Sequence, residues 1–373
     1  MQRDFPDNAS RHQQRLLLGP GPSNPYPEVM EAMVRPVVGH LDPAFLAVLD
    51  ETSERLRRAF RTCNALTLPV SGTGSAGMEA CFVNLLEPGD TAVIGANGVF
   101  GARMCEVARR CGAEVVRVEE DWGRPLDPAA LLEAQRAHPG ARIVATVHAE
   151  TSTGVRNDIE PLSVLQETDT LLLVDAVTSL GGIPLDVDAW GIDACYSGTQ
   201  KCLGVPPGLA PLTFSERAVE RVSSRDTPPQ SWYLDMGLIG SYVGAERRYH
   251  HTAPISMVYA LHAGLGVLLE EGLEVSWERH ASVGAELHAA LSDRGFTLLA
   301  QDGNRLPQLT SVSLPDGLDE AGLRRRLLHD FDIEVGAGLG DFAGRAWRIG
   351  LMGHSARRSS IVALLGALDA LLS

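Results

Sequence analysis

Residues 171–175 read Leu171-Leu172-Leu173-Val174-Asp175, four apolar side chains followed by a carboxylate. A short continuous apolar run is typical of a strand that is buried on both faces, as in a parallel sheet. The carboxylate that ends such a strand is costly to desolvate unless a cation or hydrogen-bond donors meet it. The pattern therefore indicates either a ligand-binding aspartate at Asp175 or an ordinary helix N-cap or turn aspartate.

Similar apolar runs alternate with helical patterns on either side of this stretch. Helices are expected at Pro43–Phe60, Ser75–Leu86, Gly101–Cys111, Pro128–Ala137 and Pro161–Gln166. Strands are expected at Ala65–Val70, Thr91–Gly95, Glu114–Val118, Arg142–Val147 and Leu171–Val174. This alternation predicts an α/β fold with a mostly parallel sheet that helices cover on both faces. Sheets of this kind place their functional sites beyond the carboxyl ends of the strands.

The second half of the chain has a different pattern. Helices are expected at Ile255–Glu271, Leu273–Arg294, Glu320–His329 and Ser355–Leu372, and shorter segments at Gln308–Leu314, Ile333–Val335 and Trp347–Gly350. This mixture predicts a smaller α+β domain that begins near Gly272. We therefore expect an N-terminal arm over residues 1–18, a large domain over 19–271 and a small C-terminal domain over 272–373.

Composition excludes several classes of protein. The 373 residues include 32 basic and 47 acidic ones, and 32 − 47 gives a net charge of −15, which argues against nucleic-acid binding. No segment reaches the ~20 apolar residues that span a bilayer, and residues 1–10 lack the apolar core of a signal peptide. The six cysteines show neither a CxxC pair nor a metal-ligand spacing with histidine. We expect free thiols, no metal site, no membrane partner and a cytoplasmic location.

The basic residues are almost all arginine. The one lysine among the 32 is Lys201, in the loop SGTQKCLGVPPG (197–208), which begins 22 positions after Asp175. One interpretation is a compositional bias towards arginine that left a single surface lysine. The other is a Schiff-base lysine, because small uncharged neighbours leave it without a local carboxylate. Arginine could not replace it in that role, since a guanidinium stays protonated.

Residues 71–77 read Ser-Gly-Thr-Gly-Ser-Ala-Gly, between an apolar run and a helix. The free N–H groups of a helix N-terminus bind anions, and glycine lets the backbone approach a phosphate closely. A plain strand-to-helix turn is the alternative, and a Walker-type loop is disfavoured because no lysine follows. Together, this loop, Asp175 and Lys201 predict a site for pyridoxal 5′-phosphate, with a phosphate cradle, a partner for the ring nitrogen and a covalent anchor.

The chain resembles the class V aminotransferases of fold type I, and most closely their alanine–glyoxylate and serine–pyruvate branch. The likeness runs from about Leu16 to the C-terminus, in separated motifs that occur in the family's order. These motifs are LLLGPGPSNPYP (16–27), SGTGSAGMEA (71–80), NLLEPGD (84–90), GANGVFG (95–101), ETSTGV (150–155), LLLVDAVTSLGG (171–182), GIDACYSGTQKCLGVPPG (191–208), YHHTAPI (249–255) and WRIGLMG (347–353). The resemblance implies the fold of PLP-dependent transferases of type I, with a smaller C-terminal domain.

The resemblance also implies roles for single residues. Lys201 and Asp175 match the catalytic pair, the covalent anchor and the partner of the ring nitrogen. Arg348 matches the arginine that holds the substrate α-carboxylate, and Gly21 lies in a loop that borders the same pocket. The other cofactor-binding positions are Thr73, Gly74 and Gln200 at the phosphate, Ser75 beside it, Phe100 and Val177 on the ring, Thr151 at the phenolic oxygen, and Tyr249 and Thr252 from the neighbouring subunit.

Two of these positions depart from the mammalian pattern. Phe100 stands where a tryptophan commonly stacks on the ring, and Ser75 stands where a histidine lies beside the phosphate loop. A phenyl ring still offers a flat face for stacking, so we expect the cofactor to bind. His148, His250 and His251 are interpreted as structural histidines.

The activity that the resemblance implies is ping-pong transamination from a small amino acid, alanine or serine, to a 2-oxo acid, glyoxylate or pyruvate. It also implies a homodimer with shared active sites. One alternative is the same fold with another donor, such as (S)-ureidoglycine or 2-aminoethylphosphonate. Another is a PLP lyase or cysteine desulfurase, which needs a mobile nucleophilic cysteine. A silent PLP-binding protein is disfavoured because Lys201 and Arg348 are both present.

Overall fold

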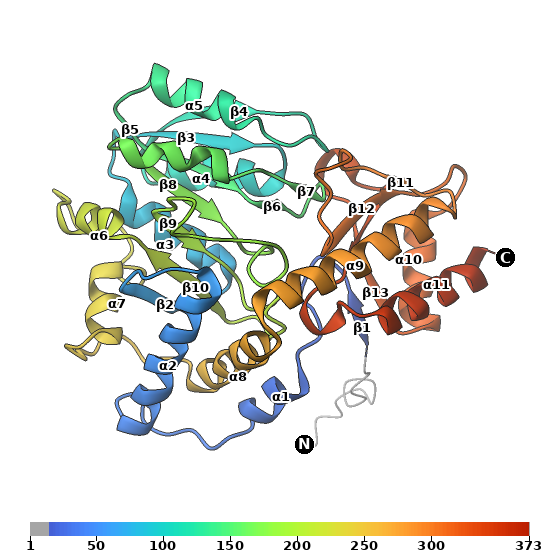
Figure 1. Ribbon diagram of the computed structural model, residues 1–373, viewed down its shortest axis with the longest axis horizontal. Coiled ribbons are helices and arrows are strands. Elements are labelled where there is room, and N and C mark those ends of the chain that lie inside the picture. The colour runs from blue at the N-terminus through green and yellow to red at the C-terminus, as the bar shows by residue number, and fades with distance from the viewer. Residues whose placement is uncertain (1–14, 373) are drawn as a thin grey trace, which may run out of the picture.

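Strand β8 (Leu171–Asp175) lies at the centre of a seven-stranded sheet in the computed structural model, which describes residues 15–372 (Figure 1). The strand order is β2-β10-β9-β8-β5-β3-β4. Its other members are β2 (Leu66–Ser71), β3 (Thr91–Ala96), β4 (Glu114–Glu119), β5 (Ala141–Val147), β9 (Ala194–Tyr196) and β10 (Leu209–Phe214). All neighbours pair in parallel except β10, which runs antiparallel to β2 and β9. The predicted mostly parallel sheet is therefore confirmed.

The apolar side chains of β8 lie on both faces of this sheet. Leu172 and Val174 belong to one buried cluster, and Leu171 and Leu173 belong to another. Alternation along a strand produces this division. The first face packs against α1 (Pro27–Met33), α2 (Pro43–Phe60), α5 (Pro128–Ala137), the 3₁₀ helix η2 (Glu160–Glu167) and α8 (Ile255–Glu271). The second face packs against α3 (Gly74–Leu85), α4 (Val99–Arg110), α6 (Glu216–Ser223) and α7 (Met236–Val243).

A second sheet of five strands occupies the C-terminal part of the chain. Its order is β1 (Leu16–Leu18), β13 (Ile333–Ala337), β14 (Ala346–Gly350), β12 (Leu309–Ser313) and β11 (Thr297–Leu298). Apolar residues of this sheet share a core with α9 (Leu273–Ser292), α10 (Glu320–Asp330) and α11 (Arg358–Leu372). Gly272, with a φ of 92°, ends α8 and lets the chain turn into α9.

The observed elements differ from the expected ones in a few places. The segment at Pro161 forms the 3₁₀ helix η2 rather than an α-helix, and the last helix begins at Arg358, after the short 3₁₀ helix η4 (Gly353–Ser355). Residues 1–14 of the expected arm lie outside the described residues, whereas Leu16–Leu18 pair in parallel with β13. The boundaries 1–18, 19–271 and 272–373 stay a prediction.

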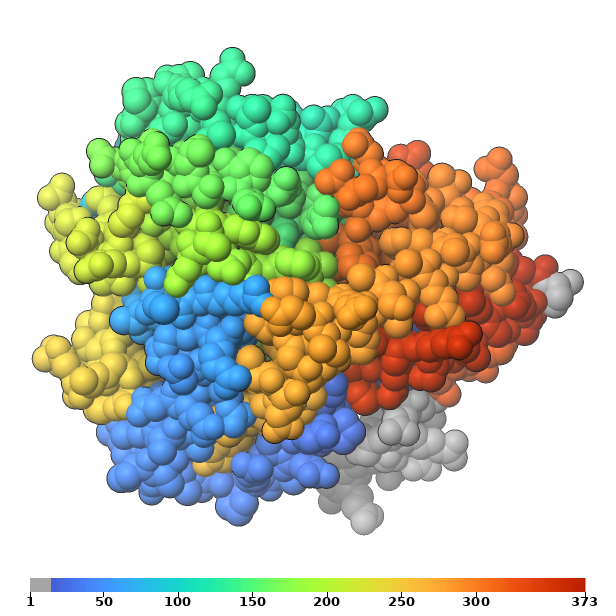
Figure 2. All heavy atoms as spheres, viewed as in Figure 1, coloured from blue at the N-terminus to red at the C-terminus, as the bar shows by residue number. Residues whose placement is uncertain are grey.

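The two sheets meet through a small apolar cluster. Its members come from both sides of the junction: Ala149, Ile183 and Cys202 from segments that follow strands of the large sheet, and Leu309 of β12 with Leu306 and Met352 from segments next to the strands of the second sheet. In the space-filling view the orange and red C-terminal residues lie directly against the green residues near position 150 (Figure 2). Between residues 15 and 372, no helix has both the length and the apolarity to cross a bilayer.

Candidate active site

A pocket of about 200 Å³ lies where β2, β5 and β8 end. The residues predicted to bind the cofactor within one subunit all line it: Thr73, Gly74, Ser75, Phe100, Thr151, Asp175, Val177, Gln200 and Lys201. Met78, Arg103, Val147, Ala149 and Thr178 complete the lining. The fold thus brings together three motifs that lie far apart in the sequence.

Asp175 ends β8 and is 3% exposed. One carboxylate oxygen accepts a hydrogen bond from the Val177 N–H at 2.8 Å, and the other accepts from the Tyr196 hydroxyl at 2.8 Å. Burial raises the pKa of Asp175 to about 6, against the opposing effect of these two donors. Tyr196 was not singled out from the sequence, although it is the register partner of Asp175 on β9. A cation opposite this carboxylate would stabilise its ionised form.

We expect the cofactor-free Asp175→Asn variant to be more stable than the cofactor-free wild type at neutral pH. The pKa of Asp175 is raised from 3.8 to about 6 in the folded chain, so the unfolded chain binds fewer protons between these values. The free energy of unfolding of the wild type therefore falls as the pH rises from about 4 to about 6, by about 3 kcal/mol in total. Urea denaturation from pH 5 to pH 8, at one protein concentration, should show the variant's advantage widening up to about pH 7. An advantage that does not change with pH would contradict the expectation.

Lys201 lies in the loop after β9, and the N-terminal loop packs against it. Its ammonium donates to the Pro20 carbonyl oxygen, while the Ser23 hydroxyl donates to the Lys201 carbonyl oxygen at 2.8 Å. Gly21, with a φ of 111°, leaves space for this lysine, because a Cβ there would collide with the Lys201 side chain. Burial and, to a smaller extent, the nearby charge of Arg348 lower the pKa of Lys201 to about 8. The amine is therefore partly neutral near physiological pH.

The phosphate end of the pocket is built on the N-terminus of α3. Thr73 is the N-cap, and the N–H groups of Gly74 and Ser75 in the first turn have no acceptor within the helix. A Cβ at Gly74 would lie 2.7 Å from a methyl group of Val177, so only glycine fits there. Within residues 15–372, the buried Oε1 atom of Gln200 has no hydrogen-bond partner. The free N–H groups at the start of α3 are donors suited to a phosphate, and the side-chain amide of Gln200 would add N–H groups beside them.

Phe100 and Thr151 form another wall of the pocket. Phe100 lies in the first turn of α4, and the guanidinium of Arg103 stacks on its ring at 4.9 Å from the centroid. Thr151 follows the short hairpin strand β6 (Ala149–Glu150), which pairs with β7 (Val155–Arg156). Arg103 was not predicted from the sequence. Arg103 lies three positions after Phe100, and residues three apart are neighbours on a helix surface. The spacing could therefore have indicated this contact.

Arg348 lies in the middle of β14 and is 9% exposed. Its Nε donates to the Ala337 carbonyl oxygen at 2.8 Å, and its Nη1 lies 3.5 Å from the Thr151 carbonyl oxygen. No carboxylate of the described chain forms an ion pair with it. Burial lowers the pKa of Arg348 to about 10, so the side chain is still charged at neutral pH. A buried guanidinium without a counter-ion is suited to bind a carboxylate.

Tyr249 and Thr252 do not line the pocket of their own subunit. Both are exposed, Tyr249 by 57%. The two histidines between them are held in place: His250 hydrogen-bonds His251 at 2.7 Å, and His251 hydrogen-bonds the Ser71 hydroxyl at 3.0 Å. This arrangement agrees with the structural role expected for both histidines.

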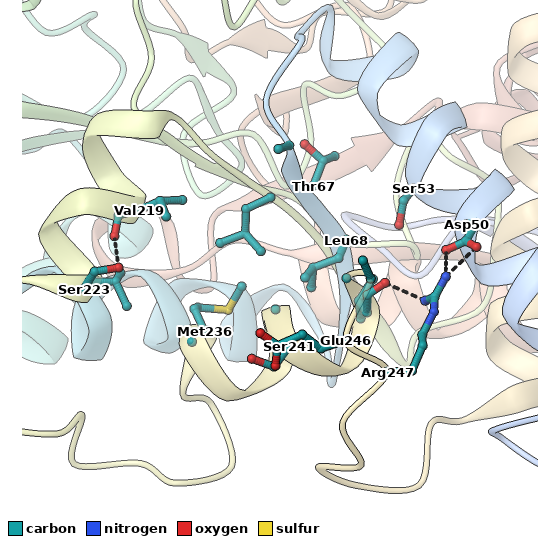
Figure 3. Close-up of a pocket in the computed structure, with 18 of the residues that line it drawn as sticks. Asp50, Ser53, Thr67, Leu68, Val219, Ser223, Met236, Ser241, Glu246 and Arg247 are labelled. Atoms are coloured by element: carbon teal, nitrogen blue, oxygen red, sulfur yellow. Dashed lines mark hydrogen bonds and ion pairs between the residues drawn. The ribbon is translucent and has the colours of Figure 1, made fainter.

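A larger cavity of about 820 Å³ lies away from these residues, between α2, α6, α7 and the edge strand β2 (Figure 3). Its floor is mostly apolar, with Leu68 and Met236, and the ion pair between Asp50 and Arg247 closes one side. None of the predicted site residues lines it.

Comparison with known proteins gives one consistent result. Residues 21–347 match the family model "Aminotransferase class-V". The chain is 40% identical to alanine–glyoxylate aminotransferase of Oryctolagus cuniculus, over 95% of this chain and 91% of that protein. It is 39% identical to (S)-ureidoglycine–glyoxylate transaminase of Bacillus subtilis, over 96% of this chain and 90% of that protein. The crystal structure of an alanine–glyoxylate aminotransferase from Nostoc sp. superimposes with a TM-score of 0.94 at 48% identity, covering 99% of this chain and 100% of that one.

Proposed function

This chain belongs to the class V aminotransferase family, and we propose that it transfers the amino group of alanine or serine to glyoxylate or pyruvate. The family also confirms the expected fold class and the expected cofactor, pyridoxal 5′-phosphate. The observation that carries the proposal is the buried guanidinium of Arg348, which lies against the carbonyl oxygen of Thr151, a residue that lines the same pocket as Lys201.

When bound, pyridoxal 5′-phosphate supplies a ring that can accept the electron pair released as an amino acid loses its α-proton. Lys201 would be its covalent anchor. When the Nζ amine is free, it can accept the α-proton of the amino acid and donate the same proton to a second atom. With a pKa near 8, this amine is close to the range in which it both accepts and donates at neutral pH. Asp175 would hold the protonated ring nitrogen, and Tyr196 keeps the carboxylate in place.

The remaining residues would bind and orient. The N-terminus of α3 and Gln200 would hold the phosphate, Phe100 would cover one face of the ring, and Val177 would pack on the other. Arg348 would bind the α-carboxylate of each substrate in turn through two N–H groups. The amino acid donor and the 2-oxo acid acceptor each carry a carboxylate next to the reacting carbon. The same arginine can therefore bind both substrates, one in each half of the reaction.

We propose that the active unit is a homodimer in which Tyr249 and Thr252 of the partner subunit complete the phosphate site. Their exposure on the free subunit supports this arrangement. So does the apolar surface beside them, where Trp232 is 61% and Tyr233 is 43% exposed. Exposed aromatic groups of this kind mark interaction surfaces.

We also propose a cytoplasmic location, which is supported by six cysteines that form no disulfide within residues 15–372.

Cysteine chemistry is disfavoured by the state of the thiol nearest to the lysine. Cys202 is 1% exposed, and its thiol lies 3.3 Å from the Thr178 carbonyl oxygen, turned into the cluster between the sheets. Burial raises the pKa of Cys202 to about 12. A thiol that stays protonated and packed is a poor nucleophile, so the structure offers no support for a desulfurase at this position.

A panel of amino donors tests the proposed function. With glyoxylate as acceptor, we expect alanine or serine to give a kcat/KM at least about 10-fold above cysteine, (S)-ureidoglycine and 2-aminoethylphosphonate. A phosphonate lacks the planar pair of oxygens that the Arg348 guanidinium would bind in a carboxylate. Single-turnover spectra without acceptor provide the second readout. If no amino acid converts the bound cofactor to its amine form, the chain is not an aminotransferase. A clear preference for (S)-ureidoglycine would make that compound the donor.

A further inference from the structure

Glu150 is a fully buried carboxylate directly behind the pocket, at 0% exposure. Its Oε2 accepts hydrogen bonds from the backbone N–H groups of Phe100 at 3.1 Å and Gly101 at 3.2 Å. Its Oε1 accepts from the Ser152 N–H at 3.1 Å and from the Ser152 hydroxyl at 2.6 Å. The carboxylate therefore receives four donors, two from α4 and two from the turn that follows β6.

These four donors favour the ionised form of Glu150. Every group that faces the two oxygens donates, and a protonated carboxyl would need an acceptor for its own hydrogen. Burial raises the pKa of Glu150, and the four hydrogen bonds oppose that shift. The negative charge also lies at the N-terminus of α4, where the helix dipole stabilises it.

The start of α4 depends on this remote side chain. Its N-cap is Gly98, which has no side chain to cap the helix, and the Val99 N–H donates to the Ser152 hydroxyl at 2.9 Å. A Cβ at Gly98 would lie 2.5 Å from the Glu150 side chain, so glycine lets the helix approach the carboxylate. Residues 50 positions away thus cap the turn that carries Phe100.

The same carboxylate also holds the substrate side of the pocket. It fixes the turn after β6, and the Thr151 carbonyl oxygen in that turn faces Arg348 Nη1 at 3.5 Å. Glu150 is also the anion whose charge favours protonated Arg348. The position of Phe100 in the pocket wall and the position of Arg348 therefore both depend on the side chain of Glu150.

We propose that Glu150 is a positioning residue that fixes Phe100 against the cofactor ring and, through the Thr151 turn, fixes Arg348 for the substrate carboxylate. The inference rests on the proposed function for the identity of cofactor and substrate. It goes beyond a helix cap, because it predicts effects on two ligands that Glu150 does not touch.

The test is Glu150→Gln, which keeps the shape but turns one acceptor into a donor that faces other donors. We expect the cofactor-free variant to bind pyridoxal 5′-phosphate about 10-fold more weakly or worse, measured by absorbance titration. The visible circular dichroism of the bound cofactor should change, because the ring loses its fixed contact with Phe100. Propionate, an unreactive carboxylate, should inhibit the variant holoenzyme at least about 5-fold more weakly.

Asp193→Asn is the matched control. Asp193 is also a buried carboxylate that accepts from a backbone N–H, that of Leu172 at 2.9 Å, and from a hydroxyl, that of Ser215 at 2.7 Å. It also forms an ion pair, with Arg217 at 3.4 Å, so its loss is expected to destabilise the fold. It lies outside the pocket lining, so Asp193→Asn should leave cofactor affinity within about 2-fold at a similar loss of thermal stability. An equal loss of cofactor affinity in both variants would overturn the proposal, as would unchanged cofactor and propionate binding in Glu150→Gln.

If Glu150→Gln does not fold, Ser152→Ala tests the same contacts more mildly. It removes the hydroxyl donor to Glu150 and the acceptor of the Val99 N–H, so a loss of cofactor affinity of about 3-fold or more is expected. No loss would overturn the proposal. Cofactor binding needs no substrate, so these titrations separate a failure at Glu150 from a failure of the proposed donor and acceptor.

Discussion

Lys201→Arg is expected to lower kcat by about 10⁴-fold or more. Arginine keeps the positive charge and most of the length but cannot be deprotonated in a protein. It can therefore neither anchor the cofactor nor take the α-proton.

The single lysine makes this prediction unusually direct to measure. Borohydride reduction of the wild-type holoenzyme should attach the cofactor to one internal peptide, the one that contains residue 201. The matched control is Arg345→Lys, which adds a second lysine on the exposed surface, where Arg345 stacks on Phe342 at 5.8 Å. The new lysine should stay unlabelled. Labelling of another amine, or more than about a tenth of wild-type activity in Lys201→Arg, would defeat the assignment.

Local patterns predicted most of the large sheet because several of its strands are short apolar runs that can be recognised from their own residues. The run at Leu171–Asp175 is apolar at every position before the carboxylate, which is what a strand between two helical layers requires. Strands β3 and β5 are also mostly apolar, apart from Thr91, Arg142 and Thr146.

The loop at 71–77 and Asp175 were predictable for a related reason, since each stands at the carboxyl end of an expected strand and these ends lie at the same edge of the sheet. Lys201 follows β9, which was not expected, so its place in the loop 197–208 was inferred from its neighbours instead.

Elements that depend on a distant partner were not predicted. Strand β1 has only three residues, and its pairing partner β13 is 317 positions away (333 − 16), so no local pattern marks it as a strand. The segment between 194 and 243 was assigned no element, although β9, β10, α6 and α7 lie there. β10 contains Pro211 and β9 has three residues, so neither shows the usual length or composition of a central strand.

The site shows the same limit at the level of side chains. Sequence reasoning identified residues that line the pocket, but not the residues that hold them in place. Glu150 precedes Thr151 in the motif ETSTGV, yet its hydrogen bonds reach Phe100 and Gly101, fifty residues earlier. Tyr196 contacts Asp175 only because β8 and β9 pair in that register. Such contacts follow from packing, which one sequence alone does not reveal.

Arg348→Gln is expected to lower kcat/KM for the amino acid by about 10²–10³-fold, because removing one partner of a buried charge pair costs about 3–4 kcal/mol. Glutamine can keep one hydrogen bond but supplies no charge to a carboxylate that has left water. Steady-state kinetics with alanine and glyoxylate give the measurement. The control is Arg345→Gln, three positions earlier and exposed, which should leave kcat/KM within about 2-fold.

A substrate without the carboxylate separates binding from general damage to the site. Alaninamide should react at similar rates with the wild type and Arg348→Gln, because it offers nothing for the guanidinium to bind. The variant should also alter Lys201, since the charge of Arg348 is one cause of its lowered pKa. Without that charge the pKa of Lys201 rises above about 8, so labelling of its amine by cyanate in the cofactor-free protein should need higher pH. Equal losses for alanine and alaninamide, with an unchanged labelling profile, would show that Arg348 supports the fold rather than the substrate carboxylate.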